Sequence, residues 1–102
     1  MANNYKNAKL DLTATSVTTL YTCPVAKTAV FKSILVSEDT GSADTITVTV
    51  TNGSSVFSLF KVKAVAANTT VELLTAPLVI EESEVVKVTA ATANRLHVVA
   101  SF

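Results

Sequence analysis

From Leu10 onward, apolar and polar residues alternate along the chain with a period of two. This alternation places successive side chains on opposite faces of a strand, whereas an amphipathic helix needs a period near 3.6. The clearest example is residues 45–51, in which four threonines alternate with Ile46, Val48 and Val50. No segment has a convincing helical period, so the pattern predicts a chain that is nearly all β.

Residues that favour turns divide this pattern into short segments. Pro24 ends one of them, because proline cannot donate a hydrogen bond to a sheet ladder. The pair Asn52-Gly53 predicts a type I′ hairpin turn, in which both central residues take positive φ, between antiparallel strands. About eight short strands are expected, and nine segments are candidates for them: residues 10–14, 18–22, 27–37, 45–51, 56–63, 69–74, 78–81, 84–90 and 95–102.

Short strands at regular spacing, joined by polar turns, are typical of antiparallel two-sheet β-sandwiches, among them jelly rolls. A closed barrel is the alternative architecture. Residues 1–9 come before or at the start of the alternation and are expected to form an N-terminal arm. Residues 10–102 are expected to form a single sandwich domain.

Composition excludes several classes of function. Hydrophobic residues make up 49% of the 102 residues and charged residues 16%, which argues against intrinsic disorder. Net charge is zero, so the basic excess that nucleic-acid binding requires is missing. No apolar run approaches the roughly 20 residues that span a bilayer, and no basic, then apolar, leader begins the chain. We therefore expect no nucleic-acid or membrane partner, and synthesis in a cytoplasm without export.

Candidate chemistry is sparse. His97 and Cys23 are the only histidine and cysteine, and no nucleophile, base and acid signature surrounds them. One of each cannot complete a tetrahedral zinc shell. The acidic turn at residues 38–44 places carboxylates around Gly41 as a calcium loop would, but it lacks EF-hand spacing and is otherwise a solvated turn. We expect no enzyme activity, no cofactor and no metal site.

Several strands carry apolar side chains on both faces. In residues 56–63, strict alternation predicts Phe57 and Leu59 on one face and Phe60 on the other. Such a strand is either central in the sandwich or at a contact between subunits, because soluble monomers rarely expose large apolar patches. On the second alternative, the candidate interface residues are Tyr5, Val30, Ile34, Phe57 and Leu59.

The threonines of residues 45–51 form an uncharged polar face. A solvent-facing surface, a contact with another protein and an ice-ordering plane are the three interpretations. The ice-ordering plane is the least supported, because we expect this row of threonines, a comb of hydroxyls, to occupy a single strand, which is too narrow for such a plane.

Five segments of the chain together resemble small β-sandwich virion proteins of tailed bacteriophages, particularly marine and cyanobacterial ones. They are TTLYTCP at residues 18–24, AVFKSILV at 29–36, DTITVTVT at 44–51, PLVIEESEVVKV at 77–88 and LHVVASF at 96–102. The similarity covers about residues 10–102. Two positions depart from the usual pattern of these virion proteins: Ser83 stands where their short acidic turn between two apolar strands, here residues 81–84, often carries glycine, and Cys23 stands where a small aliphatic residue is more common.

The resemblance implies a non-enzymatic structural protein located in the virion. We expect a capsid decoration or cement protein, a homotrimer whose residues 1–9 touch the shell and which bridges major capsid proteins. The alternatives are a neck, tail or fibre component of the virion and a host-facing adhesin module. The resemblance is moderately specific for a virion β-sandwich and does not fix its position in the particle.

Overall fold

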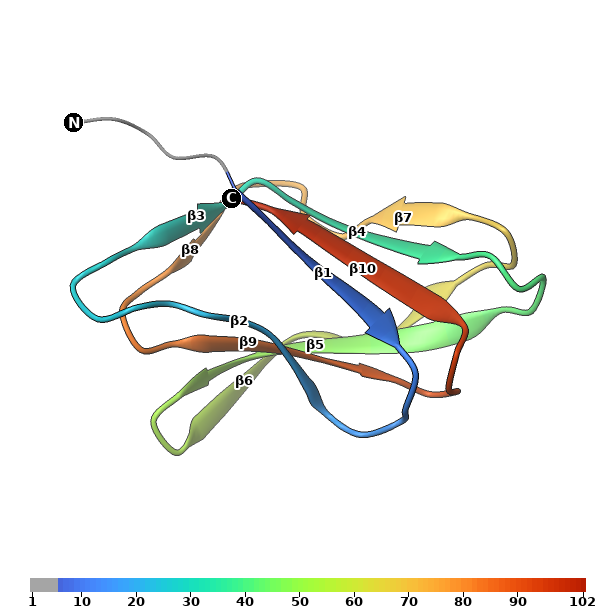
Figure 1. Ribbon diagram of the computed structural model, residues 1–102, viewed down its shortest axis with the longest axis horizontal. Helices are drawn as coiled ribbons and strands as arrows, with labels where there is room; N and C mark the ends of the chain where they lie inside the picture. The colour runs from blue at the N-terminus through green and yellow to red at the C-terminus, as the bar shows by residue number, and fades with distance from the viewer. Residues whose placement is uncertain (1–5) are drawn as a thin grey trace.

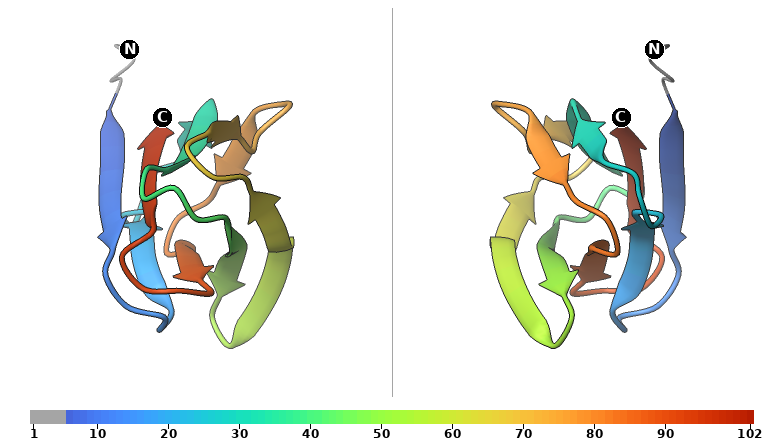
Figure 2. Two further views of the ribbon diagram at one scale, coloured as in Figure 1. Left: turned by 90° about the vertical axis from the view of Figure 1, so that its right-hand side faces the viewer. Right: turned by 90° about the vertical axis from the view of Figure 1, so that its left-hand side faces the viewer.

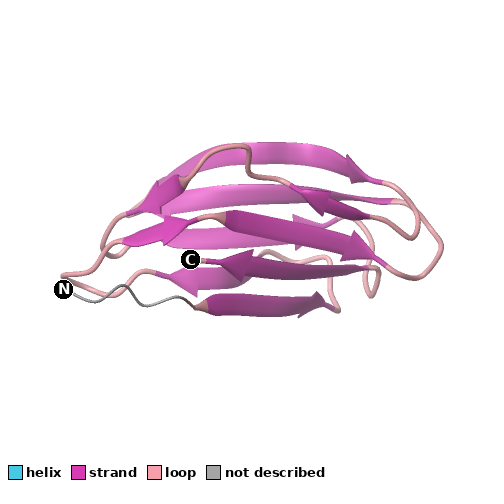
Figure 3. Cartoon of the chain, turned by 90° about the horizontal axis from the view of Figure 1, so that it is seen from above, coloured by secondary structure: helices cyan, strands magenta, loops and turns pink. Residues whose placement is uncertain are grey.

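The computed structural model describes residues 6–102, and every regular element in that part of the chain is a β-strand (Figure 3). The all-β fold predicted from the alternation is confirmed. The strands are β1 (Asn7–Leu12), β2 (Thr18–Thr22), β3 (Ala29–Phe31), β4 (Ser33–Glu38), β5 (Asp44–Asn52), β6 (Ser55–Val65), β7 (Thr70–Glu72), β8 (Leu78–Ile80), β9 (Val85–Ala90) and β10 (Leu96–Ser101).

Two four-stranded antiparallel sheets form the body of the molecule (Figures 1 and 2). One has the order β1-β10-β4-β7 and the other β2-β9-β5-β6, while β3 and β8 form a separate two-stranded sheet. The predicted two-sheet sandwich is therefore correct, and both large sheets keep free edges that a closed barrel would not have.

The strand pairs follow one simple rule. β5 pairs with β6, β4 with β7, β3 with β8, β2 with β9 and β1 with β10. The chain is thus one long hairpin folded at residues 53–54, and it is wrapped so that β5 also pairs with β9 and β4 with β10. A long hairpin wrapped into two packed sheets is a jelly roll.

Alternation determines the core, because every second side chain of the inner strands points between the two sheets. In β5, Ile46 and Val48 are fully buried, whereas the threonines that alternate with them are only half-buried. Transfer of each such side chain from water contributes about 1.5–3 kcal/mol before entropy is subtracted. The buried apolar residues of β4, β9 and β10 occupy the same alternate positions.

Three aromatic rings extend this core toward the β3–β8 pair. Phe31 is fully buried and stacks on Phe102 with ring centroids 4.8 Å apart, while Tyr21 meets the edge of Phe31 at 5.5 Å. Burial raises the pKa of Tyr21, and the neighbouring thiol of Cys23 adds to the effect. Cys23 is itself buried and donates to the carbonyl of Lys27, so it serves as a small core side chain.

Three local predictions are wrong. The expected arm at residues 1–9 is too long, because β1 begins at Asn7 and the backbone of Lys6 already pairs with that of Phe102. The single strand expected at residues 27–37 is divided at Lys32, because β3 before this residue pairs with β8 and β4 after it pairs with β10.

The hairpin turn also differs from its prediction. Asn52 pairs with Ser55, so Gly53 and Ser54 are the central residues. Gly53 has a φ of +61°, and Ser54 is not among the residues with positive φ. This is the pattern of a type II′ turn, with glycine at its first central position.

Candidate interaction surface

Strand β6 is the longest strand and forms an edge of its sheet (Figure 1). Three of its large apolar side chains remain in contact with solvent: Val56 is 61% exposed, Phe57 57% and Val62 60%. Apolar surface gathered on one edge strand is unusual in a soluble monomer. Strand β6 is therefore the leading candidate for an interaction surface.

Two irregularities in the β5–β6 ladder set the faces of this strand. Phe57 lies opposite Val50, and Phe60 lies opposite Val48. The two phenylalanines are three positions apart on β6, whereas the two valines are only two positions apart on β5. The extra residue is a β-bulge, which breaks the two-residue period. Leu59 and Phe60 consequently both pack against the core, and the prediction that they lie on opposite faces is wrong.

A second shift of register follows toward the end of β6. Val62 adopts a φ of +53°, which is a strained conformation for a β-branched residue. Its backbone N–H donates to the Oγ1 of Thr47 at 3.1 Å instead of to a ladder carbonyl. The bulged half of β6, which also carries Lys61 and Lys63, is thus irregular, while residues 55–58 form an unbroken ladder with β5.

The β3–β8 pair carries a second, smaller apolar surface. Val30 and Val79 lie directly opposite each other and are 42% and 55% exposed. The alternate positions, Ala29, Phe31 and Ile80, are buried in the core. Val79 has the exposure expected of a contact residue, but the sequence pattern did not single it out.

The five predicted interface residues therefore have different positions. Phe57 and Val30 are at the surface, and Leu59 is half-buried against the core. Ile34 is fully buried between the two sheets, so its prediction as a contact residue is wrong: its inward position on β4 belongs to the core. Tyr5 lies outside the described residues.

The polar face predicted for β5 extends over its neighbours. Thr47 lies beside Thr89 of β9, and Thr49 beside Ser58 of β6. Hydroxyls on several strands contradict the expectation of a comb confined to one strand. Lys87 and Val85 interrupt this face, so it is not a uniform hydroxyl array.

His97 lies on the outer face of β10 between two carboxylates. Its Nε2 is 3.3 Å from Asp11 Oδ1, and its Nδ1 is 3.7 Å from Asp39 Oδ2. All three side chains are substantially exposed, so these pairs are screened by water. One carboxylate lies beside each ring nitrogen, so His97 links β10 to β1 and to the turn after β4.

The acidic turn holds its carboxylate inside the molecule. Glu38 is 2% exposed and accepts backbone hydrogen bonds from Thr40, Gly41, Ser42 and Asn68 at 2.9–3.1 Å, together with one from the Thr40 hydroxyl. Burial alone would raise the pKa of Glu38, but these hydrogen bonds outweigh it and lower the pKa to about 2. Glu38 therefore organises two loops, a role that the calcium-loop hypothesis did not anticipate.

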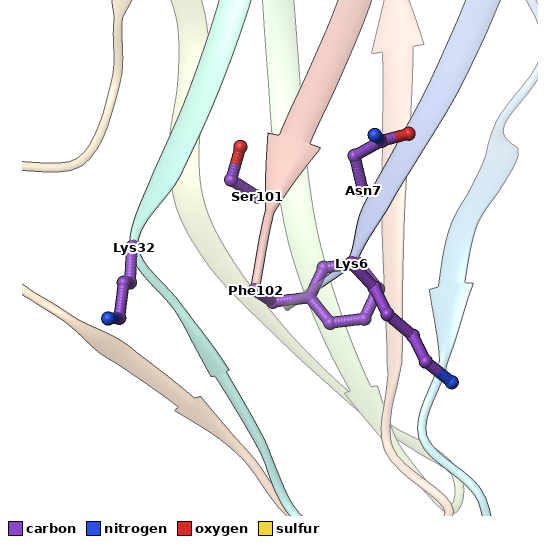
Figure 4. Close-up of a pocket in the computed structure, with 5 residues that line it drawn as sticks. All are labelled: Lys6, Asn7, Lys32, Ser101 and Phe102. Atoms are coloured by element: carbon purple, nitrogen blue, oxygen red, sulfur yellow. The ribbon is translucent and has the colours of Figure 1, made fainter. Parts of the chain in front are cut away.

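Other chemistry is limited within residues 6–102. No group of three or more histidine, cysteine or acidic side chains is arranged to hold a metal ion in that part of the chain. A shallow hollow of about 240 Å³ lies beside Lys6, Lys32 and Phe102, but the two lysine side chains point away from each other (Figure 4). The hollow does not converge two cations on one ligand.

A larger apolar depression, of about 790 Å³, lies at the opposite end of the sandwich. Its lining is mostly small apolar side chains, among them Ala43, Ala64, Ala66 and Ala91. Its one carboxylate, Asp44, is buried and accepts the backbone N–H of Thr92 at 3.1 Å. The depression therefore offers shape but few polar groups for recognition.

The chain matches no family model, no curated protein and no solved structure. None of the described residues belongs to a helix long and apolar enough to cross a membrane.

Proposed function

We propose that this protein is a non-enzymatic structural component of a bacteriophage virion, acting as a capsid decoration or cement protein. Such a protein would bind across junctions between major capsid proteins. It would stabilise the assembled shell by mass action, as any ligand does that binds one state of a system in preference to another. The active form would be a homo-oligomer located in the particle.

The observation that supports this role is the exposed apolar surface of a small domain. Eight large hydrophobic side chains of the described residues are exposed, and they include three on β6 and an adjacent pair on β3 and β8. Isolated exposed valines are ordinary, but grouped ones on edge strands are typical of surfaces that contact another protein. The sequence resemblance to virion β-sandwich proteins supplies the setting, and jelly rolls are common in virus particles.

The copy number of the polypeptide per purified virion tests the proposal. Quantitative mass spectrometry against the major capsid protein should give a ratio near one or a simple fraction of one. A copy number sufficient only for a single ring or a few fibres would reassign the protein to the neck, tail or fibre. Absence from the particle would overturn the virion role altogether.

A further inference from the structure

We propose that residues 56–58 of β6 pair edge to edge with the same residues of a second copy, antiparallel and about a two-fold axis beside Phe57. Each copy would then contribute one half of a continuous eight-stranded sheet. Its strand order would be β2-β9-β5-β6 in one copy, followed by the reverse order, from β6 to β2, in the partner. The inference deepens the oligomer part of the proposed function, but it concerns a contact that the purified chain makes by itself.

Strand edges expose unpaired backbone groups, and proteins normally protect them with charges, bulges or short length. The other free edges of this fold are protected in these ways. β1 carries Lys9 and Asp11, β2 has a register shift beside Leu20, and β3, β7 and β8 have three residues each.

The first half of β6 has none of these protections. Residues 54–60 contain no charge and no proline, and residues 55–58 keep a regular ladder with β5. The side chains there, Val56 and Phe57, are among the most exposed apolar groups of the described chain. An exposed, regular and apolar edge of this kind binds an added strand through backbone hydrogen bonds and side-chain burial.

The lysines of β6 favour one particular register for pairing with a second copy. With the two-fold axis beside Phe57, Val56 lies opposite the partner's Ser58, and Lys61 lies opposite the partner's Gly53. The two copies of Lys61 are then eight positions apart, or about 27 Å at 3.4 Å per residue, which is well beyond the screening length.

Other registers are unfavourable. Moving the axis to Val62 would place Lys61 directly opposite the partner's Lys63, and like charges in that position are destabilising. The bulges in this half of β6 would also interrupt the new ladder. The strand is therefore self-complementary only about its uncharged half.

The contact would bury Val56 and Phe57 from both copies. The two phenylalanine rings would meet beside the axis, where aromatic pairs contribute about 0.5–1.5 kcal/mol beyond area burial. A contact of one strand edge is small, so the dimer should dissociate on dilution. Two-fold pairing gives a dimer, whereas the trimer expected from the resemblance would need a heterologous contact elsewhere.

Analytical ultracentrifugation of the purified chain from micromolar to millimolar concentration tests the inference. The mass should rise from 10.7 kDa toward twice that value. Phe57→Lys should weaken the association at least tenfold, because it places two cations at the axis. Val79→Lys is the matched control, since Val79 is 55% exposed on another sheet and should leave the association unchanged.

If Phe57→Lys does not fold, Phe57→Cys decides the question. A cysteine beside the axis should form an intermolecular disulfide under mild oxidation, whereas Val79→Cys should not, and native Cys23 is 1% exposed and should stay unreacted. A wild-type chain that is monomeric throughout, or an oligomer insensitive to residue 57, overturns the inference. A dimer that is absent from virions would overturn the proposed function and leave this contact standing.

Discussion

The carboxylate of Glu38 accepts a hydrogen bond from the backbone N–H of Asn68 at 3.1 Å and so joins the turn after β4 to the loop between β6 and β7. Both loops use left-handed residues: Gly41 has a φ of +84° and Asn68 of +54°. One buried side chain therefore fixes two segments that are thirty residues apart in the sequence. Its charge is essential to this role, because all of its partners are donors.

Acid should destabilise the protein through Glu38. Its pKa is about 2 in the folded chain, below the ordinary value of 4.5, so the unfolded state binds this proton more tightly. The stabilisation is fully present above about pH 4.5 and is lost as the pH falls toward 2. Glu38→Gln should lower the melting temperature at pH 7, and the difference from wild type should shrink across that window in melts recorded by circular dichroism.

Glu81→Gln, which neutralises an exposed acid in another turn, is the control for this series. Its melting temperature should stay close to that of the wild type at each pH from 7 to 2. A Glu38→Gln protein that retained the acid sensitivity of the wild type between pH 4.5 and 2 would contradict the assignment.

The β5–β6 turn should depend on the glycine at its first central position. A Cβ at Gly53 would meet nothing within 4 Å, so the loss in Gly53→Ala comes from the backbone φ of +61° alone. We expect unfolding free energy to fall by at least about 1 kcal/mol, measured by urea denaturation. Ser54→Ala, at the next position, should change it by less than about 0.5 kcal/mol. Equal effects at the two positions would refute the type II′ assignment.

The sequence predicted elements better than it predicted faces. Alternation identified β2 with its bounds and β5 within one residue at each end, because the buried side chains of these strands are apolar apart from Asp44 at the start of β5. Bulges leave no such mark: nothing in the order of Ser58, Leu59 and Phe60 shows that two consecutive side chains turn toward the core. The alternation therefore located β6 but could not assign its apolar side chains to the right faces.

The sequence pattern also did not predict that Glu38 is buried. An acidic residue at the end of a strand, followed by Asp, Thr and Gly, has the composition of a solvated turn. Its partners include the N–H of Asn68, and the pairing of β4 with β7, far along the chain, brings that loop close. Contacts across such a separation depend on topology, which local pattern does not specify.

Alanine substitutions at Phe31 and Phe57 test which of the two phenylalanines belongs to the core. Phe31 is fully buried between Tyr21 and Phe102, so Phe31→Ala should lower the unfolding free energy by about 3–5 kcal/mol. Phe57→Ala should cost about 1 kcal/mol or less in dilute protein, because more than half of the side chain is already in solvent. Urea denaturation at micromolar concentration measures both. Comparable losses would place Phe57 in the core and remove it from the proposed contact.

The acidic turn before β9 offers a stabilising substitution. Ser83 has a φ of +66°, and its N–H donates to the carbonyl of Cys23 at 2.8 Å, so the left-handed conformation is held by a hydrogen bond that glycine would keep. The strain relieved in Ser83→Gly is roughly 1–2 kcal/mol, against about 0.4–1 kcal/mol of added entropy in the unfolded chain.

We therefore expect Ser83→Gly to raise the unfolding free energy by up to about 1 kcal/mol, or the melting temperature by about 4–8 °C per kcal/mol. Ser54→Gly makes the same change at a position without positive φ and should instead destabilise by about 0.4–1 kcal/mol. The opposite signs separate backbone strain from any general effect of glycine. If both substitutions destabilised the protein, the turn at Ser83 would not be strained, and the departure from glycine at this position would have no energetic consequence.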